Sequence, residues 1–418
     1  MMNGQEMHDF MRELYPLCRS LTGEGTKETL RMIGERVPLK ITSVPSGTDV
    51  LGWTIPDEWN PRSAYIITPD GRKIADFTEH NLHLNNYSDS IDATMSLDDL
   101  RPHLRSLPEH PDWIPYRYDF YWKSGWGFCL TDAELQALQP GDYLVHIDVD
   151  KEPGQLHFGE CVLPGETNET VLLSTYICHP SLCNDNLSGP VVLTAMAERL
   201  RERQRHYTYR IVFVPEVSGA IAWLASLPLT DMNIVAGLIP MCCGDPGPIT
   251  YKRSKQGASV CDRIVEKVLH DRGSPYSVID WHPNGSDERQ FCSPGLNWPI
   301  GCLMRTAPAV FPEYHTSADD LDFVTAAALG DTLYTLGAVV DAVESNSRYT
   351  STHPVAEGYL GDAYAPTLES RLLQGWVLAL ADGEMSVLDI AERSGLPIAD
   401  VARAAELLQS QGYVTRGQ

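Results

Sequence analysis

Short apolar stretches alternate with longer amphipathic segments from residue 155 onward. The strand-like stretches are VLLSTYI (171–177), YRIVFV (209–214), NIVAGLI (233–239) and PIGCLM (299–304). Segments of helical period lie between and after them, such as GPVVLTAMAERLRER (189–203) and ASVCDRIVEKVLHDRG (258–273). Strands that alternate with helices predict crossover connections and a mostly parallel sheet covered by helices. The pattern therefore predicts an α/β fold.

The pattern differs in the rest of the chain. Residues 1–48 contain helical stretches that we expect to pack on the sheet formed by residues 155–352. Residues 49–154 are rich in aromatic residues, prolines and short alternating runs, which predicts an inserted small β-rich domain. Residues 353–365 have the composition of a linker. Residues 366–418 predict helices separated by turns and a final strand, the pattern of a winged helix-turn-helix domain.

Composition indicates a globular, intracellular protein. The 418 residues are 43% hydrophobic, enough for two or three domains of ~150 residues each. The N-terminus has no basic flank leading into an apolar stretch, so we expect no secretory signal. No uninterrupted apolar run approaches the ~20 residues that cross a bilayer, so we expect no membrane contact. The ten cysteines are scattered, which is typical of reduced thiols in the cytoplasm.

Charge argues against nucleic acid as a partner. The formal net charge is −24, which repels phosphate backbones at long range. Residues 366–418 contain four arginines, no lysine and seven acidic residues, the wrong sign for phosphate contacts by a winged helix. We therefore expect this domain to serve in contacts with a protein partner or a second copy of the chain.

Residues able to bind or work with a metal follow several of the predicted strands. They are His179, Asp185, Glu216 and His315. In an open α/β sheet, ligands bind beyond the carboxyl ends of the strands, so these side chains are expected to share one crevice. Each alone has a common structural explanation, such as a buried imidazole, a turn aspartate or a glutamate at a helix N-terminus. Cys178 and Cys183 beside His179 raise the alternative of a sulfur-rich zinc site, but the paired cysteines of such sites are missing.

Further candidates lie in the loops around this crevice. Asp287 is expected to support a metal-ligating imidazole through a hydrogen bond, with Ser286 and Tyr314 nearby. Arg289 and Arg305 are candidates for holding a substrate carboxylate. A basic cluster, Lys252, Arg253 and Lys255, either receives an acidic substrate group or lies in a solvated loop. The aromatic residues of the inserted domain either cover the crevice or form that domain's own core; they are Trp113, Tyr116, Tyr118, Tyr121, Trp122 and Trp126.

Taken as a set, these residues resemble the zinc aminopeptidase superfamily, which includes bacterial leucyl aminopeptidases and glutaminyl cyclases. The matching motifs are His179, Asp-Asn-Leu-Ser-Gly at 185–189, Glu216 with Gly219, Ser286-Asp287 with Phe291, and Tyr314-His315-Thr316. With RSLTGEG near the N-terminus, the inserted domain and the C-terminal domain, the chain is more narrowly similar to aminopeptidase-like proteins of polysaccharide-biosynthesis gene clusters. The resemblance implies a small peptide or amide substrate, cleaved by metal-activated water with Glu216 as general base.

Two positions depart from the superfamily pattern. Val217 stands where the second of two adjacent glutamates binds metal, and Met241 stands where an aspartate is expected, with Asp245 a little beyond. The resemblance then implies one zinc ion held by His179, Asp185 and His315, the ligand set of a site with an open position. Alternatively Glu216 is the fourth ligand, no base is left, and the protein is a catalytically silent binding or scaffold protein.

Overall fold

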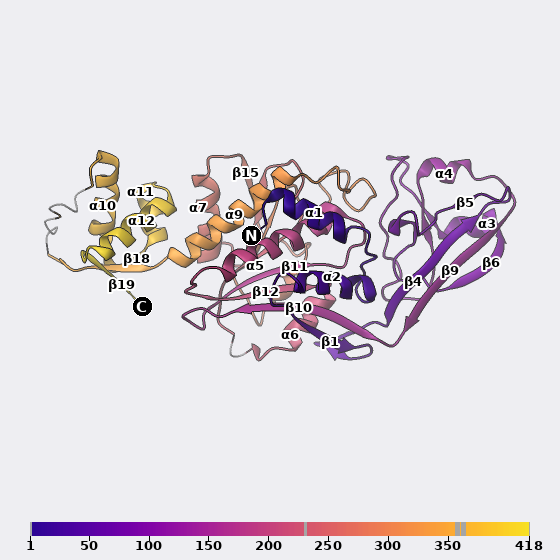
Figure 1. Cartoon of the computed structure of the whole chain (residues 1–418), viewed down its shortest axis with the longest axis horizontal. Coiled ribbons are helices and arrows are strands. Elements are labelled where there is room, and N and C mark those ends of the chain that lie inside the picture. The colour runs from indigo at the N-terminus through magenta and orange to yellow at the C-terminus, as the bar shows by residue number, and fades with distance from the viewer. Residues whose placement is uncertain (1, 230–231, 356–359, 361–364, 418) are drawn as a thin grey trace.

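Eight strands form the central sheet of the computed structural model, which describes residues 2–229, 232–355, 360 and 365–417 (Figure 1). In spatial order they are β1 (Lys40–Pro45), β10 (Gln155–Leu163), β12 (Thr208–Val214), β11 (Thr170–Tyr176), β13 (Ile234–Pro240), β16 (Ile300–Met304), β14 (Ile249–Lys252) and β15 (Tyr276–Ile279). The strands from β12 to β16 pair in parallel, as does β14 with β15. The remaining three pairings are antiparallel. The α/β prediction is confirmed, with a mixed sheet that is parallel at its centre.

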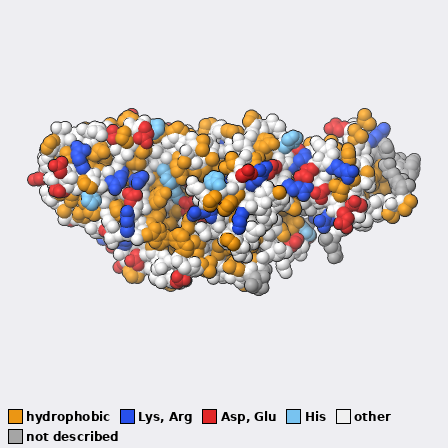
Figure 2. Space-filling view, turned by 180° about the vertical axis from the view of Figure 1, so that it is seen from behind, with side chains coloured by type: hydrophobic (Ala, Val, Ile, Leu, Met, Phe, Trp, Pro, Cys, Tyr) orange, Lys and Arg blue, Asp and Glu red, His pale blue; other side chains and the backbone are white. Residues whose placement is uncertain are grey.

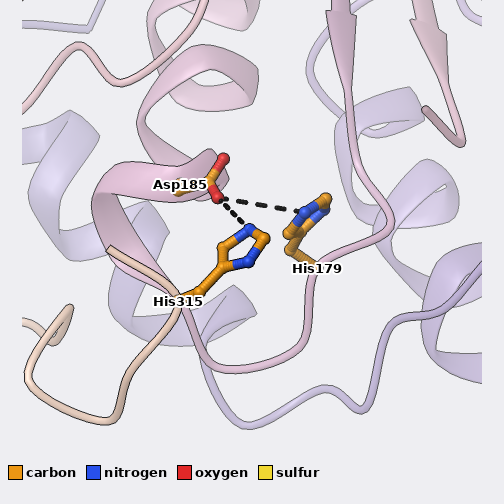
Figure 3. A group of neighbouring side chains, drawn as sticks. All are labelled: His179, Asp185 and His315. Atoms are coloured by element: carbon orange, nitrogen blue, oxygen red, sulfur yellow. Dashed lines mark ion pairs between the residues drawn. The ribbon is translucent and has the colours of Figure 1, made fainter. Parts of the chain in front are cut away.

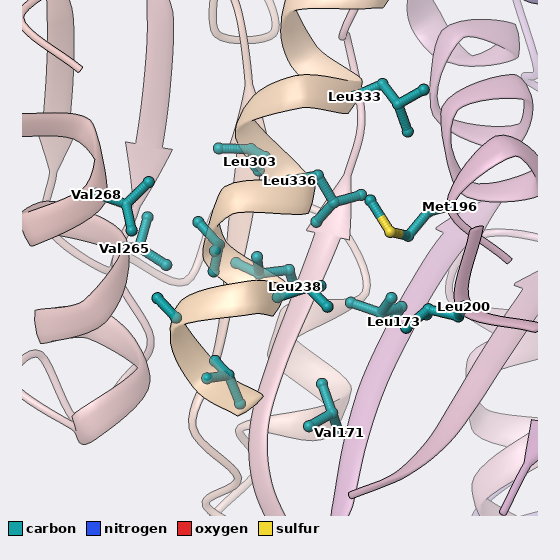
Figure 4. Packing of buried hydrophobic residues seen from close by; sticks show 14 of the residues in the cluster. Val171, Leu173, Met196, Leu200, Leu238, Val265, Val268, Leu303, Leu333 and Leu336 are labelled. Atoms are coloured by element: carbon teal, nitrogen blue, oxygen red, sulfur yellow. The ribbon is translucent and has the colours of Figure 1, made fainter. Parts of the chain in front are cut away.

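Helices cover both faces of this sheet because its central strands are apolar on both sides. On one face lie α1 (Gly4–Leu14), α2 (Glu24–Gly34), α5 (Ser188–Arg201), α7 (Val260–Asp271) and α9 (Ala326–Ser345). Figure 4 shows Leu173 and Leu238 of the sheet packed with Met196 of α5 and Leu336 of α9. The preceding residue along β11, Leu172, belongs to the core on the other face with α6 (Ser218–Ala225). This sandwich fixes the strand ends from which the site is built.

The inserted domain leaves the central sheet after β1 and returns at β10, the strand that pairs with β1. Its main sheet has the order β5 (Lys73–Ile74), β4 (Glu58–Ile67), β9 (Asp142–Glu152), β6 (Ile91–Ser96). Two small pairings accompany it, β2 (Asp49–Val50) with β3 (Trp53–Thr54) and β7 (Leu104–Arg105) with β8 (Phe128–Cys129). Short helices complete it, namely η1 (Asn81–His83), α3 (Leu97–Leu100), η2 (Arg101–His103) and α4 (Asp132–Ala137). The predicted β-rich insertion is thus present, at the far end of the molecule from the C-terminal domain (Figure 1).

The C-terminal domain contains α10 (Leu368–Leu380), α11 (Val387–Ser394) and α12 (Ile398–Ser410). Its sheet has the order β18 (Asp382–Ser386), β17 (Arg348–Ser351), β19 (Val414–Arg416). The middle strand β17 precedes the proposed linker and pairs with β18 and β19. Residues 348–351, expected within the α/β domain of residues 155–352, therefore belong to the sheet of the winged helix. Most of the proposed linker lies outside the described residues.

The winged helix packs against the body of the protein. α11 contacts α7, and α12 contacts both α7 and α9. Arg263 of α7 forms ion pairs with Asp389 and Glu392, and the N–H of Ile398 donates to Asp271 Oδ2 at 2.8 Å. Figure 2 shows acidic and basic side chains interspersed over the C-terminal domain, at the right of the view. No continuous basic stripe is seen among the described residues on this face.

Two sequence expectations bear on the environment of the protein. By length and composition α9 could cross a membrane, but its apolar window is 61% buried, as in the core helix of a globular protein, so this signal is weak. All ten cysteines are free thiols, and all except Cys18 are buried.

Candidate metal centre

Three of the predicted ligands meet at the carboxyl edge of the central sheet. His179 follows β11, Asp185 lies in the turn before α5, and His315 lies in the loop between β16 and α9. One nitrogen or carboxylate oxygen from each lies within 4.8 Å of the others. Figure 3 shows the two imidazole rings turned toward the carboxylate, whose Oδ2 is 2.9 Å from His315 Nε2 and 3.9 Å from His179 Nε2. Among the described residues this is the one group of at least three such side chains close enough to hold a metal ion.

The hydrogen bonding of Asp185 leaves one of its oxygens for a cation. The Tyr176 hydroxyl donates to Oδ1, whereas Oδ2 is buried and has no hydrogen-bond partner. His315 Nε2 is likewise buried without a hydrogen bond, although it faces Oδ2. These two atoms face each other at 2.9 Å and form no hydrogen bond with any other described residue, so a cation between them would bind both. Two imidazole nitrogens and one carboxylate oxygen form a donor set that suits zinc.

The protonation states also suit metal binding. Burial lowers the pKa of His179 to about 4, which keeps its imidazole neutral near pH 7. Burial acts to raise the pKa of Asp185, but the nearby His179 and His315 outweigh it and lower that pKa to about 2. A neutral imidazole and an ionised carboxylate are the forms that bind metals.

The turn that carries Asp185 is fixed by a carboxylate that sequence reasoning missed. Asp319 accepts hydrogen bonds from the backbone N–H groups of Asn184 at 2.5 Å and Asp185 at 2.8 Å. The Asn186 amide donates to Thr175 Oγ1 at 3.0 Å. An aspartate in a loop is usually solvated, so no pattern in the sequence indicates that Asp319 is fully buried here.

Glu216 lies beside the cluster, and its side chain is more exposed than those of His179, Asp185 and His315. Its Oε2 is 3.9 Å from His179 Nε2, and its Oε1 accepts a hydrogen bond from the Ser286 hydroxyl at 2.7 Å. Burial, followed by the negative charges of Asp287 and Asp185, raises the pKa of Glu216 well above its usual value. A carboxylate with a raised pKa near a metal centre is suited to accept and return a proton.

Asp287 was expected to hydrogen-bond a metal-ligating imidazole, but it instead holds the backbone next to Glu216. Its Oδ1 accepts the N–H of Val217 at 2.6 Å, and burial raises its pKa to about 7. Val217 has φ 61°, a strained conformation for a β-branched residue. Backbone strain of this kind is often found at functional sites.

The positions expected to hold a second metal do not offer ligands. Val217 places a hydrocarbon side chain after Glu216, and Met241 is buried among hydrophobic residues. Asp245 is occupied, because it accepts hydrogen bonds from Asn184 and Thr306 side chains and from backbone N–H groups. The sulfur-rich alternative also fails, since Cys183 packs in the hydrophobic core and neither Cys178 nor Cys183 belongs to a group of ligands among the described residues.

The predicted cationic substrate groups lie elsewhere or are already paired. Arg305 is buried and forms an ion pair with Asp331 of α9. Arg289 is exposed on α8 (Glu288–Phe291), and its guanidinium group forms no hydrogen bond or ion pair with the described residues. Lys252 is buried against Glu288, so it is no solvated loop residue. Arg253 pairs with Glu266 and Asp280, and the Lys255 ammonium donates to the Cys292 carbonyl, which leaves no free basic cluster for an acidic substrate.

Part of the aromatic cluster covers the candidate metal centre. The Tyr116 ring lies 5.2 Å from that of His179 and 5.1 Å from that of His315, and the N–H of Tyr116 donates to the His315 carbonyl. Tyr314 stacks on His315 at 3.9 Å. By contrast, the three tryptophans of the cluster contact other residues of the inserted domain. Trp113 stacks on His110, Trp126 stacks on His103, and Trp122 lies edge-on to Trp53.

A cavity opens where the inserted domain meets the His315 loop. Its volume is about 510 Å³, and its wall includes Tyr116, Arg117, Tyr118, Tyr314 and His315. Tyr118 is 46% exposed and stands edge-on to His315. The inserted domain therefore supplies one wall of a cavity that reaches a predicted metal ligand.

Comparison with known proteins identifies the family. Residues 8–346 match a family described as a domain of unknown function (DUF4910). The chain belongs to this family. Residues 362–416 separately match a winged helix-turn-helix family, which confirms the predicted C-terminal domain.

The relatives of this DUF4910 protein are aminopeptidase-like. A Clostridium acetobutylicum protein, named provisionally as a polysaccharide biosynthesis protein with an aminopeptidase-like domain, is 43% identical over 97% of this chain and 95% of its own. A crystal structure from the same organism, named provisionally as a peptidase, is 42% identical with a TM-score of 0.95 and covers 99% of this chain and 96% of its own. A zinc aminopeptidase from Bacillus subtilis is 12% identical, with a TM-score of 0.60 over 82% of this chain and 95% of its own. The predicted resemblance to zinc aminopeptidases is confirmed at the level of the fold.

Proposed function

We propose that this DUF4910 protein is a single-zinc hydrolase that cleaves a peptide or amide bond. The observation that carries the proposal is the meeting of His179, Asp185 and His315, whose ligand atoms lie within 4.8 Å of one another, with Glu216 Oε2 3.9 Å from His179 Nε2. The aminopeptidase-like fold of its relatives supports a hydrolase scaffold.

Each residue has a distinct role in this proposal. His179, Asp185 and His315 would hold the ion. Zinc, when bound, supplies Lewis acidity that polarises a carbonyl group and lowers the pKa of water. Glu216 accepts a proton from the attacking water and returns it to the leaving amine, while Ser286 holds the Glu216 carboxylate in place.

The cavity between Tyr118 and Tyr314 supports a substrate group of moderate size next to the cleaved bond. The name of the Clostridium relative mentions polysaccharide biosynthesis, so sugar substrates with an amide bond are also worth testing. The panel should therefore contain aminoacyl amides with a free amino end and N-acylated amino sugars.

The experiment compares zinc-loaded wild type with Glu216→Gln on this panel. We expect hydrolysis by the wild type, and a loss of at least 100-fold in kcat in the variant while one zinc per chain is retained, since the amide cannot accept the proton. Asp185→Asn should instead lose zinc. Full activity of Glu216→Gln would refute the role of base.

A second candidate is a binding protein without catalysis. Glu216 lies close enough to His179 to serve as a fourth ligand, and then no base would remain. Stoichiometric zinc without turnover of any substrate, together with weaker zinc binding by Glu216→Gln, would favour this second function.

A further inference from the structure

A buried lysine lies behind the loop that joins β15 to α8, residues 280–287. Lys252 is the last residue of β14, and its side chain is 4% exposed. Its ammonium group donates to the carbonyls of His282 and Asn284, both at 3.0 Å, and to Glu288 Oε1 at 2.7 Å. An ammonium group has three hydrogens, so all of them are used on this loop and on the first residue of α8.

The loop backbone packs directly on this ion pair. A Cβ atom added to Gly285 would lie 2.1 Å from Glu288 Oε1 and 2.5 Å from Lys252 Nζ. No side chain other than hydrogen fits at this position without moving the pair. The next residue is Ser286, whose hydroxyl donates to Glu216 at 2.7 Å.

The same loop also holds the backbone at Val217, the residue after Glu216. Asp287 accepts the N–H of Val217, and Val217 keeps its positive φ in that position. The Glu216 side chain and the following peptide are thus both held by residues that Lys252 and Glu288 anchor.

We propose that the buried Lys252–Glu288 pair positions the Glu216 carboxylate by anchoring the loop that carries Ser286 and Asp287. The inference rests on the proposed function, because it treats Glu216 as the general base. Stability alone gives a poor reason for such a pair, since a buried ion pair is often no more stabilising than apolar residues of similar size. Lys252 and Glu288 are positioning residues that act through Ser286 and Asp287.

The test replaces the whole pair, because Lys252→Met alone would leave Glu288 buried and unpaired. The double variant Lys252→Met with Glu288→Met should bind one zinc per chain and unfold at a thermal midpoint close to that of the wild type. Its KM should lie within twofold of the wild-type value, whereas its kcat should be at least tenfold lower. The matched control is Arg305→Met, which removes another strand-end cation that pairs with Asp331, away from the loop. Its kcat should be unchanged. An unchanged kcat in a folded double variant would overturn the proposal.

A second measurement does not depend on turnover. Deuterium exchange of the peptide that spans residues 214–219 reports the Val217 N–H, which should exchange at least tenfold faster in the double variant and unchanged in Arg305→Met. If the wild type hydrolyses nothing but this difference is seen, the proposed function fails and the anchoring role stands. If protection at Val217 is the same in all three proteins, the anchoring role fails.

Discussion

Two residues of the candidate site have backbone conformations that L-amino acids rarely adopt. Val217 has φ 61° and His315 has φ 57°. The Ser218 N–H donates to the Glu216 carbonyl at 2.7 Å across Val217, which makes a tight γ-turn directly after the proposed base. Conformations of this kind cost about 1–3 kcal/mol each and persist only where the surroundings hold them.

The strain at Val217 can be measured with two substitutions. Val217→Ala and Val217→Gly both remove the isopropyl group, but only glycine adopts a positive φ without steric cost. We expect Val217→Gly to be more stable than Val217→Ala by about 1 kcal/mol, the reverse of the usual order at ordinary positions. Urea unfolding of the zinc-free proteins measures the difference. Equal stability would mean that Val217 is not strained.

Among single residues, the sequence predicted which side chains meet at the candidate site but not what supports them. His179, Asp185, Glu216 and His315 lie together in the structure, as their positions after strand ends predicted. The partner of Asp287 could not be found, because it is a backbone N–H whose direction depends on the turn at Val217.

The helices and strands bring the site together through close backbone contacts. The first turn of α5 follows Asp185 and lies against the ends of β11 and β13. A Cβ added to Gly189 would lie 2.3 Å from Thr175 Oγ1 and 2.5 Å from the Pro240 carbonyl. The sequence predicted both the strands and the helix, but not that their backbones touch at this glycine.

Gly189→Ala should therefore destabilise the protein and the site. We expect a loss of about 1–3 kcal/mol in the free energy of unfolding, because the added methyl group meets backbone that cannot move freely. Zinc affinity should fall as well, since the turn of Asp185 must shift. Gly375→Ala in α10 is the matched control, because no described atom lies within 4 Å of the added Cβ. It should stabilise the helix by about 0.5–1 kcal/mol. The same effect from both substitutions would contradict the close packing.

The contact between the inserted domain and α1 predicts a pH dependence. His80 caps η1, accepting the Leu82 N–H through Nδ1, and its Nε2 lies 3.3 Å from the Tyr15 hydroxyl. Burial lowers the pKa of His80 from 6.5 to about 4. Between these values the unfolded chain binds the proton and the folded protein does not, so stability falls as pH falls from about 6.5 to 4.

The expected loss from His80 is up to about 3 kcal/mol, since each pKa unit corresponds to about 1.4 kcal/mol. His80→Gln does not titrate, and its side-chain amide can still accept one hydrogen bond and donate another, as the neutral imidazole does. Urea unfolding at pH 7.5 and pH 4.5 should show a smaller acid destabilisation in the variant than in the wild type. The same pH dependence in both proteins would exclude His80 as a source of the effect.

Across the whole molecule, one hydrophobic core joins the α/β domain to the winged helix. It runs from the sheet through Leu336 and Val340 of α9 to Leu388 of α11 and Val401 of α12. The sequence predicted both domains from their separate patterns. It could not predict that β17 would complete the winged-helix sheet, because pairing between distant segments leaves no periodic signal in either of them.

This shared core predicts that the two domains unfold together. We expect a single unfolding transition in guanidinium, with deuterium exchange in α9 and α12 responding to denaturant with the same midpoint. Arg263→Ala combined with Asp271→Ala removes the ion pairs with Asp389 and Glu392 and the hydrogen bond to Ile398. The variant should exchange earlier in α12 than in α9, because the winged helix then opens first. Two separated transitions in the wild type would show that the C-terminal domain is an independent unit and that its docking on α7 and α9 contributes little to stability.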